Sequence, residues 1–234
     1  MIQVEICTPS VASAQAAREG GATRVELCRD LACGGITPTD EAIDYCVHTL
    51  GLRTHVLVRP RAGDFCYSAA EVDDIMRCIG RCRRLGAAAV VVGFLDSEGR
   101  VDTGLTHRAV LEAEGMEVTF HRAFDEARQD PLEALDAVVR CGCTRLLTSG
   151  QRPTALEGAD TLRRLVEACS DLSCHGTRFS ILAGSGVTPL NVRRLVALTG
   201  VTEVHGSCKT TLPDGTMQTD ATQVRQLLQQ CSDM

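Results

Sequence analysis

The chain has 234 residues, a formal net charge of −6 and only 3% aromatic residues. Its 44% hydrophobic and 23% charged residues are typical of a globular protein and exclude disorder over most of the chain. An acidic, aromatic-poor chain lacks the basic surface and stacking side chains of most nucleic-acid-binding proteins. The sequence shows neither a signal-peptide pattern nor an apolar run of roughly 18 residues. We therefore expect no nucleic-acid partner and no membrane partner.

Cysteine is unusually frequent, with 13 residues. The odd number and the scattered positions do not suggest a disulfide framework, and the chain has no Cys-x-x-Cys pair of the kind that binds structural zinc. Reduced thiols in a cytoplasmic protein are the better interpretation.

Short apolar segments alternate with amphipathic ones along the whole chain. The predicted strands are 2–7, 24–28, 53–59, 88–94, 117–121, 145–148, 178–183 and 201–205. The predicted helices are about 10–19, 38–49, 69–85, 103–114, 131–139, 155–170, 189–198 and 220–231. Strands separated by helices indicate βαβ crossovers and a parallel sheet. Eight such units predict a single-domain (β/α)₈ TIM barrel over residues 1–234.

The first two predicted strands repeat one pattern, VEIC at 4–7 and VELC at 25–28. Alternation along a strand puts Glu5 and Cys7 on one face, and Glu26 and Cys28 on the matching face of the next strand. In a barrel this face points inward, and the cysteines lie at the carboxyl ends, where barrel active sites are found. The pair either shares one soft metal ion or fills ordinary interior positions, since a free cysteine is a small core residue.

Two arginines follow the third predicted strand. Arg59 and Arg61 would suit a carboxylate or phosphate, because a guanidinium group matches two oxygens at once. The alternative is an ion pair of Arg61 with Asp64 that holds the loop in shape.

Two histidines end predicted strands at the same end of the barrel. His121 shares a strand face with Thr119 and should point into the mouth, and His205 lies at the matching point of the last strand. A histidine there can act as acid, base or ligand, with Glu26 as a further proton carrier. The alternative is a structural histidine bonded to a neighbouring carbonyl.

Glycine-rich loops follow the last two predicted strands. Gly184, Ser185 and Gly186 follow one of them, and Gly206 follows the other. Barrels often bind a phosphate with backbone N–H groups at these two loops.

Together these motifs resemble the CutC family, which is associated with copper homeostasis. The matching segments are VELC at 25–28, GGITP at 34–38, RPRAGDFCYS at 59–68, TFHRAFD at 119–125, LTSG at 147–150, AGSGV at 183–187 and EVH at 203–205. They occur in order over nearly the whole chain, although Ala62 stands where the family usually has glycine. The resemblance implies a cytoplasmic (β/α)₈ barrel that forms homo-oligomers, a dimer or a tetramer, and binds copper(I) through Cys7 and Cys28.

Two functions of different classes follow. The first is copper(I) binding, for which thiolate is the preferred ligand, with the two sulfurs within about 4–5 Å and reachable from solvent. The second is an enzyme acting on a small phosphorylated or carboxylated metabolite. Its anion-binding residues would be Arg59, Arg61, Gly184, Ser185, Gly186 and Gly206, and its acid–base residues would be Glu26, His121 and His205. Cys66 and Cys208 lie on loops near the mouth and are assigned to neither function.

Overall fold

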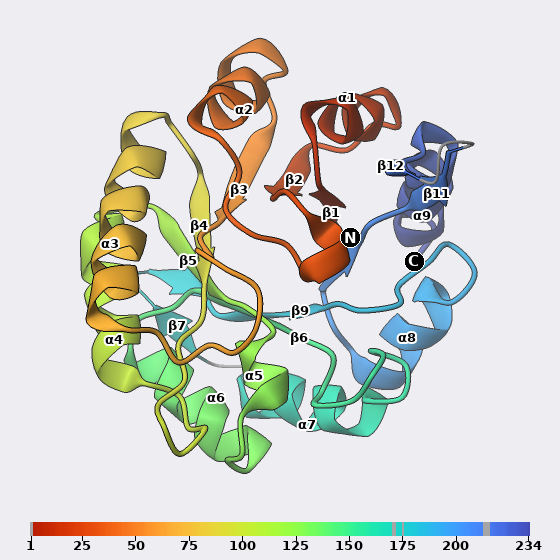
Figure 1. Cartoon of the computed structure of the whole chain (residues 1–234). Coiled ribbons are helices and arrows are strands. Elements are labelled where there is room, and N and C mark those ends of the chain that lie inside the picture. The colour runs from red at the N-terminus through yellow and green to blue at the C-terminus, as the bar shows by residue number, and fades with distance from the viewer. Residues whose placement is uncertain (1, 170–171, 175, 213–215) are drawn as a thin grey trace.

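A computed structural model of the chain describes residues 2–169, 172–174, 176–212 and 216–234. Eight parallel strands close into a barrel in the order β1-β10-β9-β6-β5-β4-β3-β2, which confirms the predicted TIM-barrel fold (Figure 1). Their bounds are β1 Gln3–Thr8, β2 Arg24–Leu27, β3 Arg53–Leu57, β4 Ala89–Val92, β5 Glu117–Phe120, β6 Arg145–Thr148, β9 Ser180–Ala183 and β10 Glu203–Gly206.

Helices surround the barrel as an outer ring (Figure 1). Their bounds are α1 Val11–Glu19, α2 Asp40–Asp44, α3 Ala69–Arg84, α4 Thr103–Ala113, α5 Ala123–Glu126, α6 Pro131–Arg140, α7 Ala159–Ala168, α8 Val192–Thr199 and α9 Ala221–Ser232. Two of them begin at typical cap residues. Ser68 and Glu71 form a complete capping box at the start of α3, and Asp130 caps α6 directly before Pro131.

The structure differs from the predicted elements in several places. The predicted helix 38–49 is α2 followed by a π-helical turn, Tyr45–Thr49. The predicted helix 155–170 begins later, at Ala159, and its last residue lies outside the described part of the chain. The predicted strand 178–183 starts at Ser180, after a small hairpin of β7 Ser173–Cys174 and β8 Thr177–Arg178. The short helix α5 and a second hairpin, β11 Lys209–Thr211 with β12 Met217–Thr219, were not predicted.

The main hydrophobic core lies between the barrel and its helices. Val4, Ile6, Val25 and Leu27 belong to it, as the alternation in the first two strands predicts. The other strand faces point into the barrel and are largely polar. The barrel interior therefore buries charged side chains such as Glu5, Arg24 and Glu26, together with the thiols of Cys7 and Cys28.

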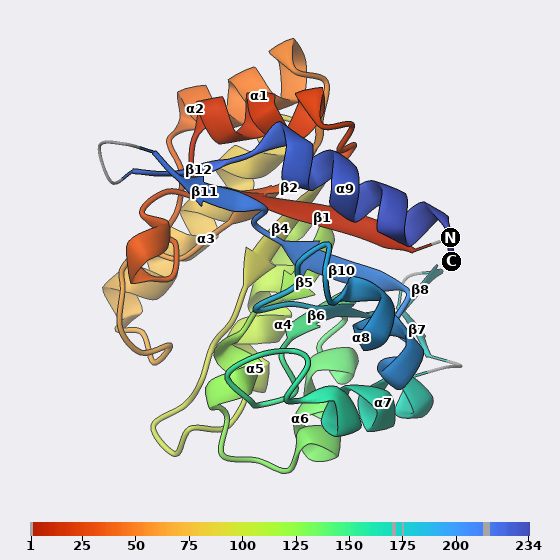
Figure 2. The same ribbon diagram turned by 90° about the vertical axis from the view of Figure 1, so that its right-hand side faces the viewer.

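The carboxyl ends of the strands form one end of the barrel, on the left in Figure 2. The loop after β2 contains a short 3-10 turn, Leu31–Cys33, and the loop after β3 runs from residue 58 to the start of α3. The hairpin β11–β12 packs against α1 at this end. In the described part of the chain, no helix is both long and apolar enough to cross a membrane.

Candidate functional site

Two thiols meet at the carboxyl ends of β1 and β2. The Sγ atoms of Cys7 and Cys28 lie 4.0 Å apart, and the Cys28 thiol also lies 3.8 Å from the carbonyl oxygen of Thr8. The separation falls within the range expected for a shared copper ion. The expected solvent access is not seen, because the residues are only 5% and 2% exposed, respectively.

The thiols lie in an apolar setting inside the barrel. Cys7 and Cys28 pack with Leu57 and Val91 as a small cluster separate from the main core, and Leu31 of the 3-10 turn packs against it. Gly35 is required beside this cluster, since its φ is +85° and a Cβ there would lie 2.9 Å from Leu57. The loop after β2 therefore covers the thiol pair.

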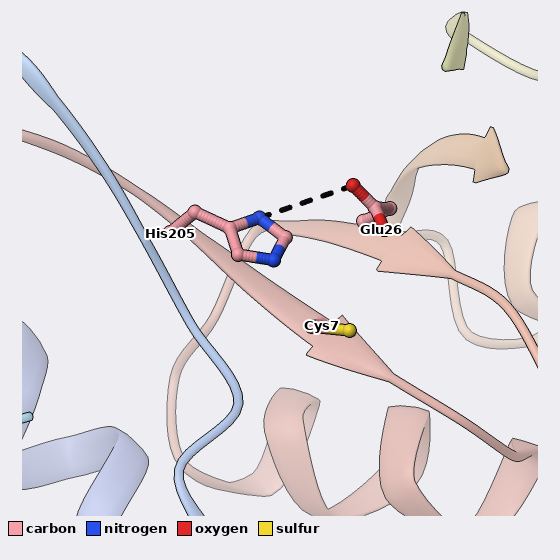
Figure 3. Close-up of side chains that lie close together, drawn as sticks. All are labelled: Cys7, Glu26 and His205. Carbon is pink, nitrogen blue, oxygen red and sulfur yellow. Dashed lines mark ion pairs between the residues drawn. The ribbon is translucent and has the colours of Figure 1, made fainter. Parts of the chain in front are cut away.

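Glu26 and His205 stand next to Cys7 (Figure 3). One ligand atom from each of these three residues lies within 4.8 Å of the other two. The strand register explains the grouping, because Cys7 pairs with Glu26 across β1 and β2, and Glu5 pairs with His205 across β1 and β10. A thiol, an imidazole and a carboxylate are all metal-ligand groups, so the residues present fit a metal ion.

Glu5 lies behind this group and is completely buried. Its Oε1 atom lies 3.0 Å from Nδ1 of His205. Its Oε2 atom lies 2.7 Å from Nδ1 of His55 and 3.1 Å from Nε of Arg24. The sequence predicts that Glu5 points inward, but it does not predict this central position between two histidines.

Burial and neighbouring groups shift the ionisation of the site. The hydrogen bond with Cys28, together with burial, raises the pKa of the Cys7 thiol well above its ordinary value. Burial, with a contribution from the charge of Glu5, raises the pKa of Glu26 to about 7. The thiol of Cys7 is therefore protonated at neutral pH, and Glu26 is poised to gain or lose a proton there.

Glu5 and His205, which pair across β1 and β10, hold opposite charges. Burial alone would lower the pKa of His205, but Glu26, a hydrogen bond with Cys7 and Glu5 outweigh it, so the pKa is raised well above the ordinary value. Burial alone would raise the pKa of Glu5, but His55, His205 and Arg24 together lower it well below the ordinary value. An ionised Glu5 can only accept hydrogen bonds, so Nδ1 of His205 donates to it.

A network of ion pairs fills the other end of the barrel. Glu203 lies 2.6 Å from Arg24 and 2.9 Å from Arg145, and Arg145 also contacts Glu117 at 3.1 Å. Arg53 reaches Glu117 from β3 at 2.5 Å. This network was not predicted from the sequence. Alternation along each strand, applied to every strand as it was to the first two, could have placed these residues inside.

Arg59 is buried at the mouth, and its guanidinium group is held by the loops around it. It donates to the carbonyl oxygens of Cys33, Gly35 and Gly63 at 2.7–3.2 Å and lies 4.8 Å from the centre of the Phe65 ring. Its Nε has no hydrogen-bond partner among the described residues. This arginine therefore joins the loops after β2 and β3.

Arg61 lies on the surface side of the same loop. It pairs with Asp64 at 2.9 Å and with Glu71 at 2.5 Å, and it also donates to backbone carbonyl oxygens of the loop. Both guanidinium groups thus have protein partners, and their predicted role in anion binding stays a prediction.

His121 is buried between aromatic rings, away from Glu26 and His205. Its Nδ1 accepts the backbone N–H of Ala123 at 3.1 Å, and its ring centre lies 4.9 Å from that of Phe65. Burial, with a contribution from the charge of Arg59, lowers the pKa of His121 to about 3. Among the described residues, no hydrogen bond or ion pair joins His121 to the group around Cys7.

The predicted glycine-rich segments lie at the carboxyl ends of β9 and β10. Ser185 and Gly186 have φ values of +76° and +73°, and the Ser185 hydroxyl donates to the carbonyl oxygen of Pro153 at 2.8 Å. A Cβ at Gly184 would lie 2.6 Å from Leu147, and a Cβ at Gly206 would lie 3.2 Å from the Val187 carbonyl oxygen. Close packing and backbone conformation are enough to explain glycine at these positions, and a phosphate site here stays a prediction.

The loop after β6 shows an anion site that the protein fills itself. The carboxylate of Asp125, in α5, accepts hydrogen bonds from the backbone N–H groups of Ser149 and Gln151 at 3.0–3.1 Å. Backbone N–H groups that converge on one point bind anions in many proteins.

Of the two unassigned cysteines, Cys66 is exposed and Cys208 is buried.

Comparison with known proteins decides the family. Residues 2–210 match the CutC family. The chain belongs to the CutC family. A family protein CutC of Chromobacterium violaceum is 45% identical over 206 residues, which cover 88% of this chain and 81% of that one. One of Bacteroides fragilis is 42% identical over 212 residues, covering 90% of this chain and 82% of that one.

Solved structures agree with both the family and the fold. The crystal structure of a candidate copper homeostasis protein CutC of Streptococcus agalactiae superposes with a TM-score of 0.81 at 31% identity, covering 88% of this chain and 99% of that one. A phosphoribosylanthranilate isomerase of Thermotoga maritima superposes with a TM-score of 0.60 at 15% identity, each chain being covered completely. The second similarity concerns the barrel fold alone.

Proposed function

We propose that this CutC family member binds copper(I) as its cargo, through Cys7 and Cys28. The single observation that carries the proposal is the 4.0 Å separation of the two sulfurs at the carboxyl ends of adjacent strands. Metal–sulfur bonds are roughly 2.3 Å long, so one ion can reach both atoms without a change in the backbone. Thiolate is also the ligand class that copper(I) prefers over carboxylate or water.

The surroundings support binding of a soft ion of low charge. Leu57, Val91 and Leu31 pack against the thiols, and these apolar contacts offer no oxygen ligand to a strongly hydrated divalent ion. Binding requires loss of the thiol protons, because the thiolate is the ligand. Burial of the residues then protects the bound ion from exchange with water.

The proposal is tested by titrating reduced, metal-free protein with copper(I) under anaerobic conditions, in competition with a chromophoric copper(I) chelator. We expect one tight site per chain in the wild type and its loss in the double variant Cys7→Ser/Cys28→Ser. The matched control is Cys78→Ser/Cys82→Ser, because these two buried thiols lie one turn apart on α3 at the outside of the barrel. Unchanged affinity in the first variant, or equal loss in both, would overturn the proposal.

A second candidate function is acid–base chemistry on a small anionic metabolite. One observation favours it: Glu26, whose pKa is raised to about 7 by burial, lies 4.0 Å from Nδ1 of His205 at the end of the barrel where such enzymes react. Arg59 and the loops at Gly184 and Gly206 would hold the anion. Titrating ¹⁵N-labelled protein with inorganic phosphate tests this function. Shifts of the Ser185, Gly186 and Gly206 amides support it, and unchanged spectra count against it.

We also propose that the protein acts in the cytoplasm as a homo-oligomer. Copper(I) held by free thiols suits a reducing compartment such as the cytoplasm, where thiols stay reduced. A dimer or tetramer is proposed from the family resemblance. Light scattering of the reduced protein at several concentrations measures the assembly, and a mass equal to one chain at every concentration would contradict it.

A further inference from the structure

We propose that Glu5 is the positioning residue of the thiol site, holding His205 by Nδ1 so that its Nε2 serves as the third ligand beside the two sulfurs. This inference rests on the proposed copper(I) binding and deepens it. It concerns a residue that lies behind the site and whose carboxylate bonds to His205 rather than to the thiols.

The first observation is the direction of the His205 ring. Nδ1 lies 3.0 Å from Oε1 of Glu5, closer than the 4.0 Å to Glu26. Figure 3 shows the other ring nitrogen on the side of Cys7. The imidazole thus presents one nitrogen to a carboxylate and the other to the thiol.

The second observation is that Glu5 cannot easily turn away. Its second carboxylate oxygen lies 3.1 Å from Nε of Arg24 and 2.7 Å from Nδ1 of His55. The residue is 0% exposed, so no water replaces these partners from outside. Arg24 on β2 and His55 on β3 therefore lie against one side of this carboxylate as close ion-pair contacts, and the other side is hydrogen-bonded to the His205 ring on β10.

Such an arrangement has a known physical effect. A metal-binding histidine usually donates its second ring N–H to a carboxylate, which sets the ring orientation and makes the other nitrogen a stronger donor to the metal. Loss of the carboxylate partner typically costs about 10–100-fold in metal affinity. Binding would release the two thiol protons and the Nε2 proton of the charged His205 ring, and two thiolates and this imidazole nitrogen would then hold the ion, with Glu26 beside them.

The test compares two buried carboxylates of the same network. Glu5→Gln removes the partner of His205. Its amide oxygen must face Arg24 and His55, which turns the NH₂ group toward Nδ1 of His205. The control is Glu203→Gln, since Glu203 also pairs with Arg24 inside the barrel but its ion pairs are with arginines. The affinity for copper(I) should fall about 10–100-fold in E5Q and change by less than about threefold in E203Q.

A second measurement needs no metal. In protein labelled with ¹⁵N-histidine, the Nδ1–H proton of His205 should resonate far downfield and exchange slowly, and His205→Asn identifies it by its loss. The signal should persist in E203Q and disappear in E5Q. Addition of Ag(I), a stable probe for copper(I), should shift Nε2 of His205 in the wild type while Nδ1 keeps its proton.

The outcomes separate the two proposals. If the wild type binds no copper(I) at its thiols, the proposed function fails, while the metal-free Nδ1–H signal still reports on the bond to Glu5. If copper(I) binds but Nε2 of His205 does not shift, or E5Q keeps both the signal and the affinity, the role of Glu5 is overturned. Should E5Q not fold, the wild-type spectra with and without Ag(I) decide alone.

Discussion

Cys7 and Cys28 lie out of register on neighbouring strands, yet their sulfurs approach to 4.0 Å. The residue of β2 that pairs with Cys7 is Glu26, so Cys28 is two positions further along. With about 4.8 Å between strands and about 3.3 Å per residue, the two Cα atoms are roughly 8 Å apart. A disulfide rarely bridges more than about 7 Å between Cα atoms. The geometry suits a shared ion and disfavours a direct bond.

This relationship predicts that the pair resists oxidation to a disulfide. Treating metal-free protein with diamide, followed by mass spectrometry of non-reduced peptides, should give no cross-link between Cys7 and Cys28. The exposed thiols of Cys33 and Cys66 provide the positive control, because they should react under the same conditions. A Cys7–Cys28 disulfide formed as fast as those reactions would contradict the prediction.

Leu31 should control access to the thiols. It packs over the Cys7 and Cys28 cluster from the 3-10 turn after β2. Leu31→Ala should increase the rate at which iodoacetamide alkylates the two thiols about threefold or more, because buried thiols react through local opening. Peptide mass spectrometry over time measures the rate. Leu111→Ala, at a 65% exposed position on α4, is the control, and equal rates in both variants would show that Leu31 does not cover the site.

The fold can be predicted from the sequence because the same alternation of a strand with a helix repeats eight times along the chain. Eight alternating segments and their caps are local features, and each strand has one face toward the helices. The hairpin β11–β12 and the short helix α5 escaped prediction because they are held by contacts with distant residues, such as those of α1 with β12. The local preference of a segment for helix or strand cannot predict such long-range contacts.

The candidate site was predictable only in part. Alternation along the strand places Cys7, Cys28 and Glu26 inside the barrel, and family resemblance points to the thiols. The position of Glu5 between His55 and His205 depends on the register of β1 with β10, which joins the two ends of the chain. The carbonyl partners of Arg59 depend on the path of two loops. The pattern of residues along a single strand therefore predicts neither the position of Glu5 nor the partners of Arg59.

Glu117 should stabilise the fold at neutral pH and lose this effect in acid. Burial alone would raise its pKa, but Arg145 and Arg53 outweigh burial and lower it below 4.5. A depressed carboxyl pKa contributes stability above the unfolded value and loses it as the pH falls through the folded value. Glu117→Gln should lower the free energy of unfolding by about 1–2 kcal/mol at pH 7.

The difference in the free energy of unfolding between the wild type and Glu117→Gln should narrow as the pH falls below about 4.5, because the unfolded chain binds the proton first. Urea denaturation at pH 7, 5 and 4 measures it. Glu167→Gln is the control, because this carboxylate is exposed on α7 and its contact with Arg163 is 3.8 Å long. A constant difference in the free energy of unfolding between E117Q and the wild type at all three pH values would show that folding does not lower the pKa of Glu117.

His121 should also make the fold less stable in acid, in this case because its neutral ring is buried. Burial and Arg59 lower its pKa to about 3, so the folded protein keeps the ring neutral while the unfolded chain binds a proton near pH 6.5. Its contribution to stability is therefore complete above the unfolded pKa and is lost as the pH falls toward the folded one. Between pH 7 and 5 the free energy of unfolding should fall by about 2 kcal/mol on account of this ring alone.

The variant His121→Asn should flatten this part of the profile, whatever its stability at pH 7, because it removes the proton that the unfolded chain gains. His48→Gln, on the exposed end of the π-helical turn, is the matched control and should leave the wild-type slope between pH 7 and 5 almost unchanged. Chemical denaturation of all three proteins at half-unit steps measures the slopes. If His121→Asn keeps the wild-type slope, the folded protein protonates His121 readily, and the ring is not held neutral by its buried position.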